Sequence, residues 1–535
     1  MQDKVVPSRR FGNAPAISSR MIGWTIYICF AGVLLLSLMP EGNRRALRIV
    51  ALLTAIVSVL FGIAGTLAAG HPHGIVNVTK LPWVQSLGIE YYLAVDGISL
   101  VMVLLTGIAS VVGILFSWNI EHRTKEFFCF YLTLIGAVYG VFLSFDLFLF
   151  FVFYELAIVP KYFLIAIWGS TNREFGAMKL ALYSFIGSAM ILVVLLGAYV
   201  VSGAKTFNLV ELSRFQFPVA FQMWALPVML AGFGILAGLW PFHTWAPTGH
   251  VAAPTAASML LAGVVMKLGA YGALRVAMTL FPRGLDDWSQ PWHGLESWRD
   301  VFALLALVGI VYGAMVAFVQ KDFKFVIGYS SVSHMGFVLL GLMTLTEIGL
   351  SGAVLQMFSH GIIAGLLFAV VGRMVYDRTH TRDLSDLEKM RLHKAIPFAA
   401  FTFVIGGLAS MGLPGFSGFV AELQVLVGAW RAFPTFAVIA GVGILVGVAY
   451  TIRTIQRSFF SGEIAVAQPG MAAPSDPVTH ARAAMEPISV PERLGAALLM
   501  GLTLVVGLQP RLLLDFITPA LKSPFFANIV KGVGL

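Results

Sequence analysis

The chain has 535 residues, of which 58% are hydrophobic and only 11% are charged, and its mean hydropathy is +0.87. A soluble domain of this composition would expose large apolar patches and aggregate, so the soluble enzyme classes are excluded. The net charge of +9 does not indicate nucleic acid as a partner. The basic residues are instead scattered through short segments between apolar runs, as the topology of a membrane protein requires.

Apolar runs long enough to cross a bilayer recur along the whole chain. A spanning helix needs about 20 such residues, and the sequence predicts an all-α polytopic membrane protein with about 14 spans. The first run, from Met21 to Pro40, is read as an uncleaved helix rather than a signal peptide, because no small-residue cleavage site follows it. The predicted spans are 21–40, 47–69, 95–118, 127–143, 146–168, 177–201, 221–241, 254–280, 301–319, 324–344, 348–376, 396–424, 434–458 and 492–515.

The charges of the connecting loops predict the orientation of these spans. Lysine and arginine gather after the odd-numbered spans, and the opposite loops contain fewer of them. The positive-inside rule then places the odd loops in the cytoplasm and both termini on the periplasmic side of a bacterial inner membrane. Arg9, Arg10 and Arg20 near the N-terminus oppose this orientation. The loop residues that favour it are Arg44, Arg45, Arg48, Arg123, Lys125, Arg173, Lys321, Lys324, Arg378, Arg382, Lys389, Arg391, Lys394, Arg453 and Arg457.

Two segments lie outside the spans, and neither carries a cofactor motif. Residues 381–394 place Leu384, Leu387 and Met390 on one stripe and predict a short amphipathic helix at the cytoplasmic surface. Residues 461–490 are rich in Ala, Pro and Ser and predict a flexible loop. Cys29 and Cys129 lack the spacing of a metal site, and no phosphate-binding or nucleotide-binding motif is found, so no metal or cofactor site is expected in this chain.

Ionisable side chains inside the apolar runs are the informative residues. Each costs roughly 3 kcal/mol at the centre of a bilayer, so it persists where it is paired or used. Carboxylate, amine and imidazole groups at similar depth are typical of a proton relay. A structural role, in which a neighbour satisfies each group, remains open and is most plausible for the two histidines. The candidate relay residues are Glu155, Lys267, Lys324, His334, His360 and Glu422.

Two prolines inside apolar runs predict broken helices. Pro241 stands in LAGLWPFHTWAP, and Pro414 stands in SMGLPGFSG among three glycines. Proline with glycine interrupts the helical hydrogen bonds, and such a break is tolerated in a bilayer only where the backbone lines a cavity or packs inside protein. Corresponding breaks in two halves of a chain are typical of transporters, whereas ordinary proline kinks are the alternative.

Several long motifs in this order resemble the antiporter-like, NuoM-type membrane subunit of respiratory complex I. The resemblance covers roughly residues 90–460, and its motifs are VDGISL, FFVFYELAIVPKYFLIAIWG, PFHTWAPTGHVAAPTAASMLLAGVVMKLGAYGALR, KDFKFVIGYSSVSHMGFVLLGL, GAVLQMFSHGI, DRTHTRDL and GLPGFSGFVAEL. It implies two inverted five-helix repeats, at 127–280 and 301–458, with broken seventh and twelfth helices. Three helices within 1–126 would precede the repeats, and 459–535 would hold the loop and the last helix.

The resemblance also implies a function for the candidate residues. It assigns Glu155, Lys267, His334, His360 and Glu422 to proton-channel positions. Other membrane subunits would be the partners, lipid the surroundings and protons the substrate. NADH, FMN, iron–sulfur clusters and quinone are expected in the partner subunits. A subunit of a multisubunit cation/proton antiporter or of a membrane-bound hydrogenase is the second hypothesis, and a non-pumping structural spacer is the third.

One position departs from the family pattern. The family usually has a lysine five residues before the proline of the PxH motif, where this chain has Leu236. Lys161 lies six residues after Glu155 instead, which on one continuous helix is about 240° around the axis and roughly 9 Å along it. Lys161 either replaces the missing lysine or extends its stem to the membrane surface, and the spacing favours the second interpretation.

Overall fold

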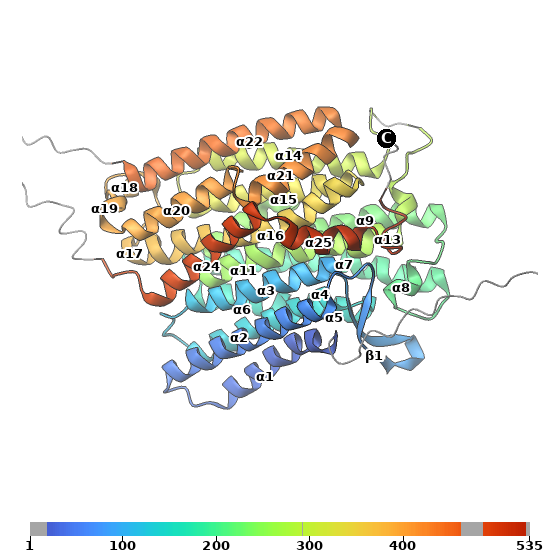
Figure 1. The fold of residues 1–535 in the computed structure, drawn as a ribbon, viewed down its shortest axis with the longest axis horizontal. Helices are drawn as coiled ribbons and strands as arrows, with labels where there is room; N and C mark the ends of the chain where they lie inside the picture. The colour runs from blue at the N-terminus through green and yellow to red at the C-terminus, as the bar shows by residue number, and fades with distance from the viewer. Residues whose placement is uncertain (1–18, 291–292, 462–484, 531–535) are drawn as a thin grey trace, which may run out of the picture.

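The computed structural model describes residues 19–290, 293–461 and 485–530, which form a bundle of roughly parallel helices (Figure 1). Arg9, Arg10 and most of the predicted loop at 461–490 lie outside these residues. The chain starts with a 3-10 turn, η1 (Ser19–Gly23), and with α1 (Trp24–Leu38), α2 (Arg44–Ala69) and α3 (Gly97–Leu115). It ends with α24 (Val490–Leu508) and α25 (Arg511–Leu521).

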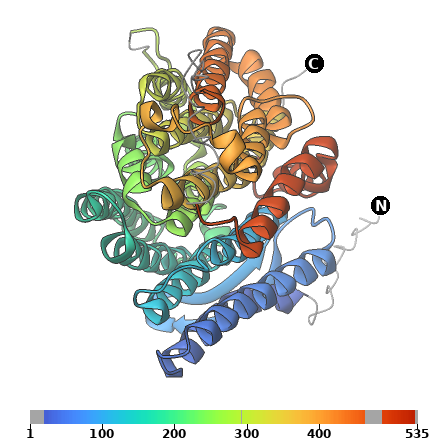
Figure 2. The same cartoon turned by 90° about the vertical axis from the view of Figure 1, so that its left-hand side faces the viewer.

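The middle of the chain forms two groups of helices. The first contains α4 (Thr124–Leu143), α5 (Leu147–Leu156), α6 (Ile158–Trp168), α7 (Arg173–Ser202), α8 (Leu209–Leu212), α9 (Val219–Ala237), α10 (Trp245–Ala252), α11 (Thr255–Leu260), α12 (Met266–Gly272) and α13 (Met278–Leu280). The second contains α14 (Trp298–Val319), α15 (Phe323–Met343), α16 (Glu347–Ala369), α17 (Asp377–Thr379), α18 (Leu384–Leu387), α19 (Leu392–Ala395), α20 (Pro397–Ser410), α21 (Ser417–Ala432) and α22 (Pro434–Ile455). Figure 2 looks along the bundle, with α1–α3 in blue on one side and the second group in yellow to orange on the other.

Within the described residues, 13 helices are long and apolar enough to cross a membrane. The predicted twelfth span is absent from that number because it is divided into the two shorter helices α20 and α21. The predicted class, a helical polytopic membrane protein, is confirmed, whereas the division into two inverted repeats stays a prediction.

Two of the spans that carry candidate relay residues lie at the core of the bundle. In Thr255–Leu280 and in Glu347–Thr379, every residue of an apolar 18-residue stretch is buried inside the protein. In Pro434–Phe460, at the periphery, only 28% of such a stretch is buried. A helix that is apolar around its whole circumference packs inside protein, whereas one in contact with lipid buries a single stripe. Both of these buried spans contain wider π-helical turns: η4 (Leu261–Val265) and η5 (Ala273–Ala277) lie in Thr255–Leu280, and η7 (Val370–Tyr376) lies in Glu347–Thr379.

A β-hairpin at one end of the bundle was not predicted. β1 (Val76–Val84) pairs antiparallel with β2 (Ile89–Val95), and the turn between them contains Gly88 at φ 68°. The strand sequences VNVTKLPWV and IEYYLAV are rich in β-branched and aromatic residues, which favour strands, but they are too short to compete with the hydropathy signal of the spans.

Both ends of the described chain lie at the hairpin. Gly23 of η1 lies beside Val78 of β1, and the Phe145 ring contacts both Tyr92 of β2, at 6.1 Å, and Phe525, at 6.4 Å. Both ends of the described chain therefore lie at the same end of the bundle.

The predicted amphipathic helix at 381–394 is wrong. The segment forms two single turns, α18 and α19, and Arg391 adopts a left-handed conformation, φ 48°, between them. The Asp383 side chain accepts a hydrogen bond from the Ser385 amide and begins the first turn. Leu384 and Leu387 are buried, as the predicted stripe required, but the left-handed residue prevents one continuous helix.

A buried ionic cluster holds α24 against the segment that directly follows α16. This segment lies at the end of the bundle where the basic loops are found. The Glu492 carboxylate receives Arg373 Nε at 2.6 Å and the Arg378 guanidinium at 2.8 Å, and the side chains of Glu492 and Arg378 are at most 2% exposed. Removing one partner of a buried ion pair leaves the other charge without compensation and typically costs about 3–5 kcal/mol.

We therefore expect Glu492→Ala to lower the free energy of unfolding by about 3 kcal/mol or more, measured by thermal denaturation in detergent. Glu486→Ala is the matched control, because that carboxylate is 75% exposed and lies 3.6 Å from Arg373. An exposed pair contributes about 0.2–1 kcal/mol. Equal melting temperatures for the two variants would contradict the structural role of Glu492.

Candidate functional site

The break after α9 contains Pro241. Helix α9 ends at Gly238, which has φ 84°, and the chain resumes in a 3-10 turn, η3 (Phe242–Thr244), followed by α10. The break removes helical partners from backbone carbonyl groups, and one of these is satisfied by a side chain: Trp245 Nε1 donates to the Ile235 carbonyl at 2.7 Å.

The break between α20 and α21 contains Pro414 and lies directly against Glu422. Gly412 and Gly415 have φ 69° and 99°, which only glycine adopts without strain. A Cβ atom on Gly412 would lie 2.9 Å from Oε2 of Glu422. The glycine thus turns the chain and leaves room for the carboxylate.

Glu422 on α21 is the first member of a row of buried polar groups, which are joined by hydrogen bonds at both ends and by a ring contact between two histidines in the middle. Its Oε1 atom lies 2.9 Å from Nδ1 of His334 on α15 and receives Gln356 Nε2 at 3.2 Å. The other ring nitrogen of His334 lies 3.1 Å from the hydroxyl of Ser410, at the end of α20. Both sides of the helix break therefore contact this imidazole.

The row continues to Lys267 through a second histidine. The His334 and His360 rings lie 5.5 Å apart between centroids, and Nδ1 of His360 lies 2.6 Å from Nζ of Lys267. The Lys267 ammonium also donates to the carbonyl of Ala262, within the π-helical turn η4. Glu422, His334, His360 and Lys267 come from α21, α15, α16 and α12, and together they form one buried polar row across the core. A structural role and a role in proton transfer are compatible for these four residues, because the same contacts provide polar partners and connect one residue to the next.

Lys324 lies apart from the row, towards the end that carries the basic loops. Its ammonium donates to the Ala253 carbonyl at 2.6 Å, just beyond the end of α10. It lines a cavity of about 660 Å³ together with Tyr376 and Asp377. The cavity gives this buried lysine a route toward solvent that Lys267 lacks.

Two histidines of the PFHTWAPTGH motif were not singled out by the sequence. His250, on α10, is fully buried, both of its ring nitrogens lack a hydrogen-bond partner, and a positive charge on it would be repelled by Lys324 and by Lys267. His243 is also buried without partners and packs edge-on against Tyr312 at 5.2 Å. Their position directly after a helix-breaking proline was the available signal.

A buried ion pair near the hairpin was also missed. Arg275 lies 2.6 Å from Asp96 of the VDGISL motif, and both side chains are 1% exposed. Aromatic rings, including those of Phe145, Phe525 and Phe526, surround the guanidinium at 5.0–5.5 Å. The sequence shows Asp96 just before α3 and Arg275 inside a span. It does not indicate that the two side chains form an ion pair.

Glu155 and Lys161 form a separate polar group. The interpretation that Lys161 extends to the membrane surface is wrong: the residue is 1% exposed, and its ammonium has no contact with solvent. The spacing argument compared Lys161 only with Glu155, whereas Lys161 lies on the buried stripe of this span, four residues after the buried Ala157, which is itself in a helical conformation. Leu236 is buried in α9.

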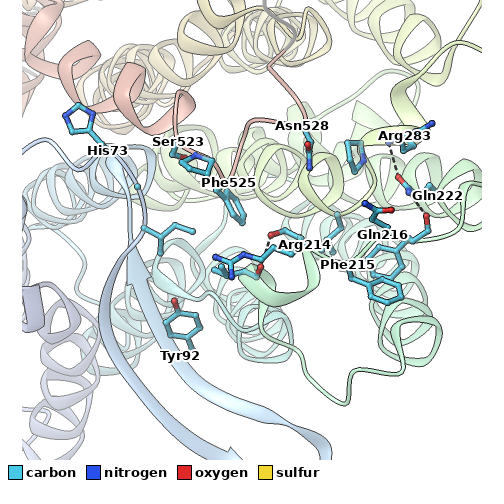
Figure 3. A pocket seen from close by; sticks show the side chains of 18 of the residues that line it. His73, Tyr92, Arg214, Phe215, Gln216, Gln222, Arg283, Ser523, Phe525 and Asn528 are labelled. Atoms are coloured by element: carbon cyan, nitrogen blue, oxygen red, sulfur yellow. Dashed lines mark hydrogen bonds between the residues drawn. The ribbon is translucent and has the colours of Figure 1, made fainter. Parts of the chain in front are cut away.

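A hollow of about 1090 Å³ lies elsewhere, where the hairpin, α8 and the C-terminal segment meet (Figure 3). Arg214, Phe215, Tyr92 and Phe525 line it, and no candidate relay residue does. It is therefore not part of the polar row. No group of three or more His, Cys, Asp or Glu residues able to hold a metal ion is found in the part of the chain that the structure describes.

Gly412→Ala is expected to destabilise the chain by about 1–2 kcal/mol, because alanine is strained in the left-handed conformation, and to displace Glu422. Thermal denaturation in detergent checks the first effect. Gly441→Ala in α22 is the control, since no atom lies within 4 Å of the added carbon and alanine favours a helix. Gly412→Ala protein that melts like the control would contradict the proposed contact.

Comparison with known proteins agrees with this geometry. Residues 144–447 match the family described as NADH:quinone oxidoreductase/Mrp antiporter, TM. Subunit M of an NADH-quinone oxidoreductase from Rhodobacter capsulatus is 35% identical over 496 residues, 90% of each chain. Chain 4-2 of an NAD(P)H-quinone oxidoreductase from Synechocystis is 38% identical over 392 residues, 72% of this chain and 68% of that one.

Solved structures show the same fold. A chain of respiratory complex I from Thermus thermophilus with bound NADH superimposes with a TM-score of 0.81 at 27% identity, covering 96% of this chain and 100% of that one. A chain of the Mrp complex from Dietzia has a TM-score of 0.79 at 20% identity, covers 97% of this chain and 98% of that one, and shares the fold. This chain therefore belongs to the NADH:quinone oxidoreductase/Mrp antiporter family of membrane proteins.

Proposed function

We propose that this chain is a proton-translocating membrane subunit of an NADH:quinone oxidoreductase, and that protons move along the row Glu422–His334–His360–Lys267. The observation that carries the proposal is the continuity of this row, in which each group lies against the next inside the apolar core. Carboxylate, imidazole and amine groups all exchange protons, and imidazole both donates and accepts.

Unpartnered polar atoms in the core support proton passage through it. Gln356 Oε1, His360 Nε2 and Ser359 Oγ are buried without hydrogen-bond partners in the described chain. Buried polar atoms of this kind are usually satisfied by internal water, which also carries protons between side chains. The row is thus suited to transfer rather than to packing alone.

The energy that such transfer requires is within the range of a single charge contact. Moving one elementary charge against 100 mV takes about 2.3 kcal/mol. Two unit charges 4 Å apart interact by about 4 kcal/mol at an effective dielectric constant of 20. Forming or opening one contact, such as that between Glu422 and a protonated His334, would be enough to drive or block a step.

The partners and orientation follow from the same proposal. Other membrane subunits would flank the chain, and NADH, FMN, iron–sulfur clusters and quinone would be held by subunits outside it. We place the end with Lys324 and the basic loops in the cytoplasm of a bacterium and the hairpin end in the periplasm, following the positive-inside rule. Lys324 and its cavity would then face the side from which protons are taken up.

The first experiment tests the row directly. Lys267→Ala and Glu422→Ala should each lower NADH-driven proton uptake in proteoliposomes by about tenfold or more, because a positioned proton carrier typically contributes about 10²–10⁴-fold. Assembly should persist, because the partners that remain, His334 and His360, can stay as neutral imidazoles and leave no unpaired charge.

Lys522→Ala is the control for this experiment, because its side chain is 60% exposed and pairs with Glu347 at the surface. Unchanged proton uptake by assembled Lys267→Ala and Glu422→Ala complexes would favour a structural spacer. Uptake that depends on sodium would favour a cation/proton antiporter, the other activity that the family description contains.

The purified chain by itself should oxidise no NADH and reduce no quinone, because it has no motif for a redox cofactor. Absorbance of NADH with the isolated chain and with the assembled complex checks this expectation. Turnover by the isolated chain would contradict it.

A further inference from the structure

We propose that Lys161 is a second proton carrier, which works with Glu155 as a charge pair that opens and closes in the first half of the chain. This inference rests on the proposed function and adds a step to it. It concerns a lysine that lies outside the row formed by Glu422, His334, His360 and Lys267.

The position of Lys161 in α6 directs it into the protein. Val159 and Phe163, on either side of it in sequence, are 48% and 37% exposed on the outer face of α6, whereas Lys161, Leu164 and Ile165 are at most 1% exposed. Ala157, four residues earlier, is also buried, so Lys161 lies on the buried stripe of the continuous span Leu147–Trp168. The side chain therefore cannot serve to contact the membrane surface.

The Lys161 ammonium is enclosed but has no fixed partner. It donates no hydrogen bond, and no carboxylate in the described residues lies within 4.0 Å of it. Another buried lysine differs in this respect: the Lys324 ammonium donates to the Ala253 carbonyl. A buried ammonium that nothing holds is costly, and an ionisable group inside a membrane protein is by default a functional one.

Glu155 supplies the complementary half of the pair. Its Oε1 atom is also buried without a hydrogen-bond partner, and its charge interacts favourably with that of Lys161. Ser188 on α7 faces the carboxylate, and Ser184, one turn earlier, has a buried hydroxyl without a partner. Glu155 and Lys161 thus form no ion pair in this structure, and a hydroxyl-bearing face of α7 lies beside the carboxylate.

The proposed step has two states. In the closed state Glu155 stabilises the protonated Lys161. When the pair opens, the ammonium releases one proton to a neighbouring acceptor and becomes a neutral amine, and one proton taken up from the aqueous side restores it. Glu155 remains a carboxylate throughout and sets the affinity of Lys161 for the proton.

Substitutions at Lys161 separate this role from a structural one. Lys161→Met removes the carrier, whereas Lys161→Arg keeps the positive charge beside Glu155 but cannot release a proton, because arginine is not deprotonated in proteins. If Lys161 carries protons, both variants of the assembled complex should show NADH-driven proton uptake in proteoliposomes reduced by about tenfold. Lys389→Met is the matched control, because that lysine is 77% exposed and should retain wild-type uptake.

Two outcomes would overturn the inference. Wild-type uptake in assembled Lys161→Met complex would show that the residue carries no proton, and full activity in Lys161→Arg with loss in Lys161→Met would show that only its charge matters. If Lys267→Ala abolishes uptake while Lys161→Met does not, the inference fails and the proposed function stands. If neither substitution affects uptake, the proposed function fails first.

Discussion

An ionisable side chain inside a bilayer must find its polar partners within the protein, and this constraint explains much of the architecture. Lys267 donates to the Ala262 carbonyl inside a π-helical turn, and Lys324 donates to the Ala253 carbonyl just beyond a helix end. In both cases an irregularity in a helix provides a backbone acceptor that a regular α-helix would already have used. The breaks in α9–α10 and α20–α21 are therefore part of how the charges are accommodated.

The charged residues divide by chemical type along the membrane normal. Arginine–carboxylate contacts lie towards the ends of the bundle, as Arg275–Asp96 at the hairpin and as Arg373 and Arg378 with Glu492 at the opposite end. Arginine keeps its proton and forms strong, fixed contacts with carboxylates. The middle of the bundle has lysine, histidine and glutamate instead, which exchange protons. The arginine–carboxylate contacts therefore hold the helices together near the ends of the bundle. The groups that can exchange protons lie between those ends.

The sequence predicted the spans and the positions of the charged groups, because hydropathy over about 20 residues is a strong local signal. It did not predict which groups meet. His334 and Glu422 are separated by 88 positions, and Lys267 and His360 by 93, so their contacts depend on packing that no local pattern encodes. The inward direction of Lys161 was missed for another reason: the spacing argument compared Lys161 with Glu155 and not with the buried stripe that contains Ala157 and Leu164. The hairpin was missed because its strands have only 9 and 7 residues.

The π-helical turn before Lys267 has a consequence for the evolution of this segment. A π-turn holds one residue more than an α-helical turn, so the eighth span is in effect an α-helix with an insertion. Deleting a single residue between 261 and 265 would restore regular α-helix and leave the helix that follows in nearly the same orientation, because the π-turn accommodates its extra residue locally. Such a deletion would keep the composition and hydropathy of the span almost unchanged, yet it would remove the wider turn in which the Ala262 carbonyl accepts a hydrogen bond from Lys267. The length of this segment is therefore under a constraint separate from that on the identity of its residues.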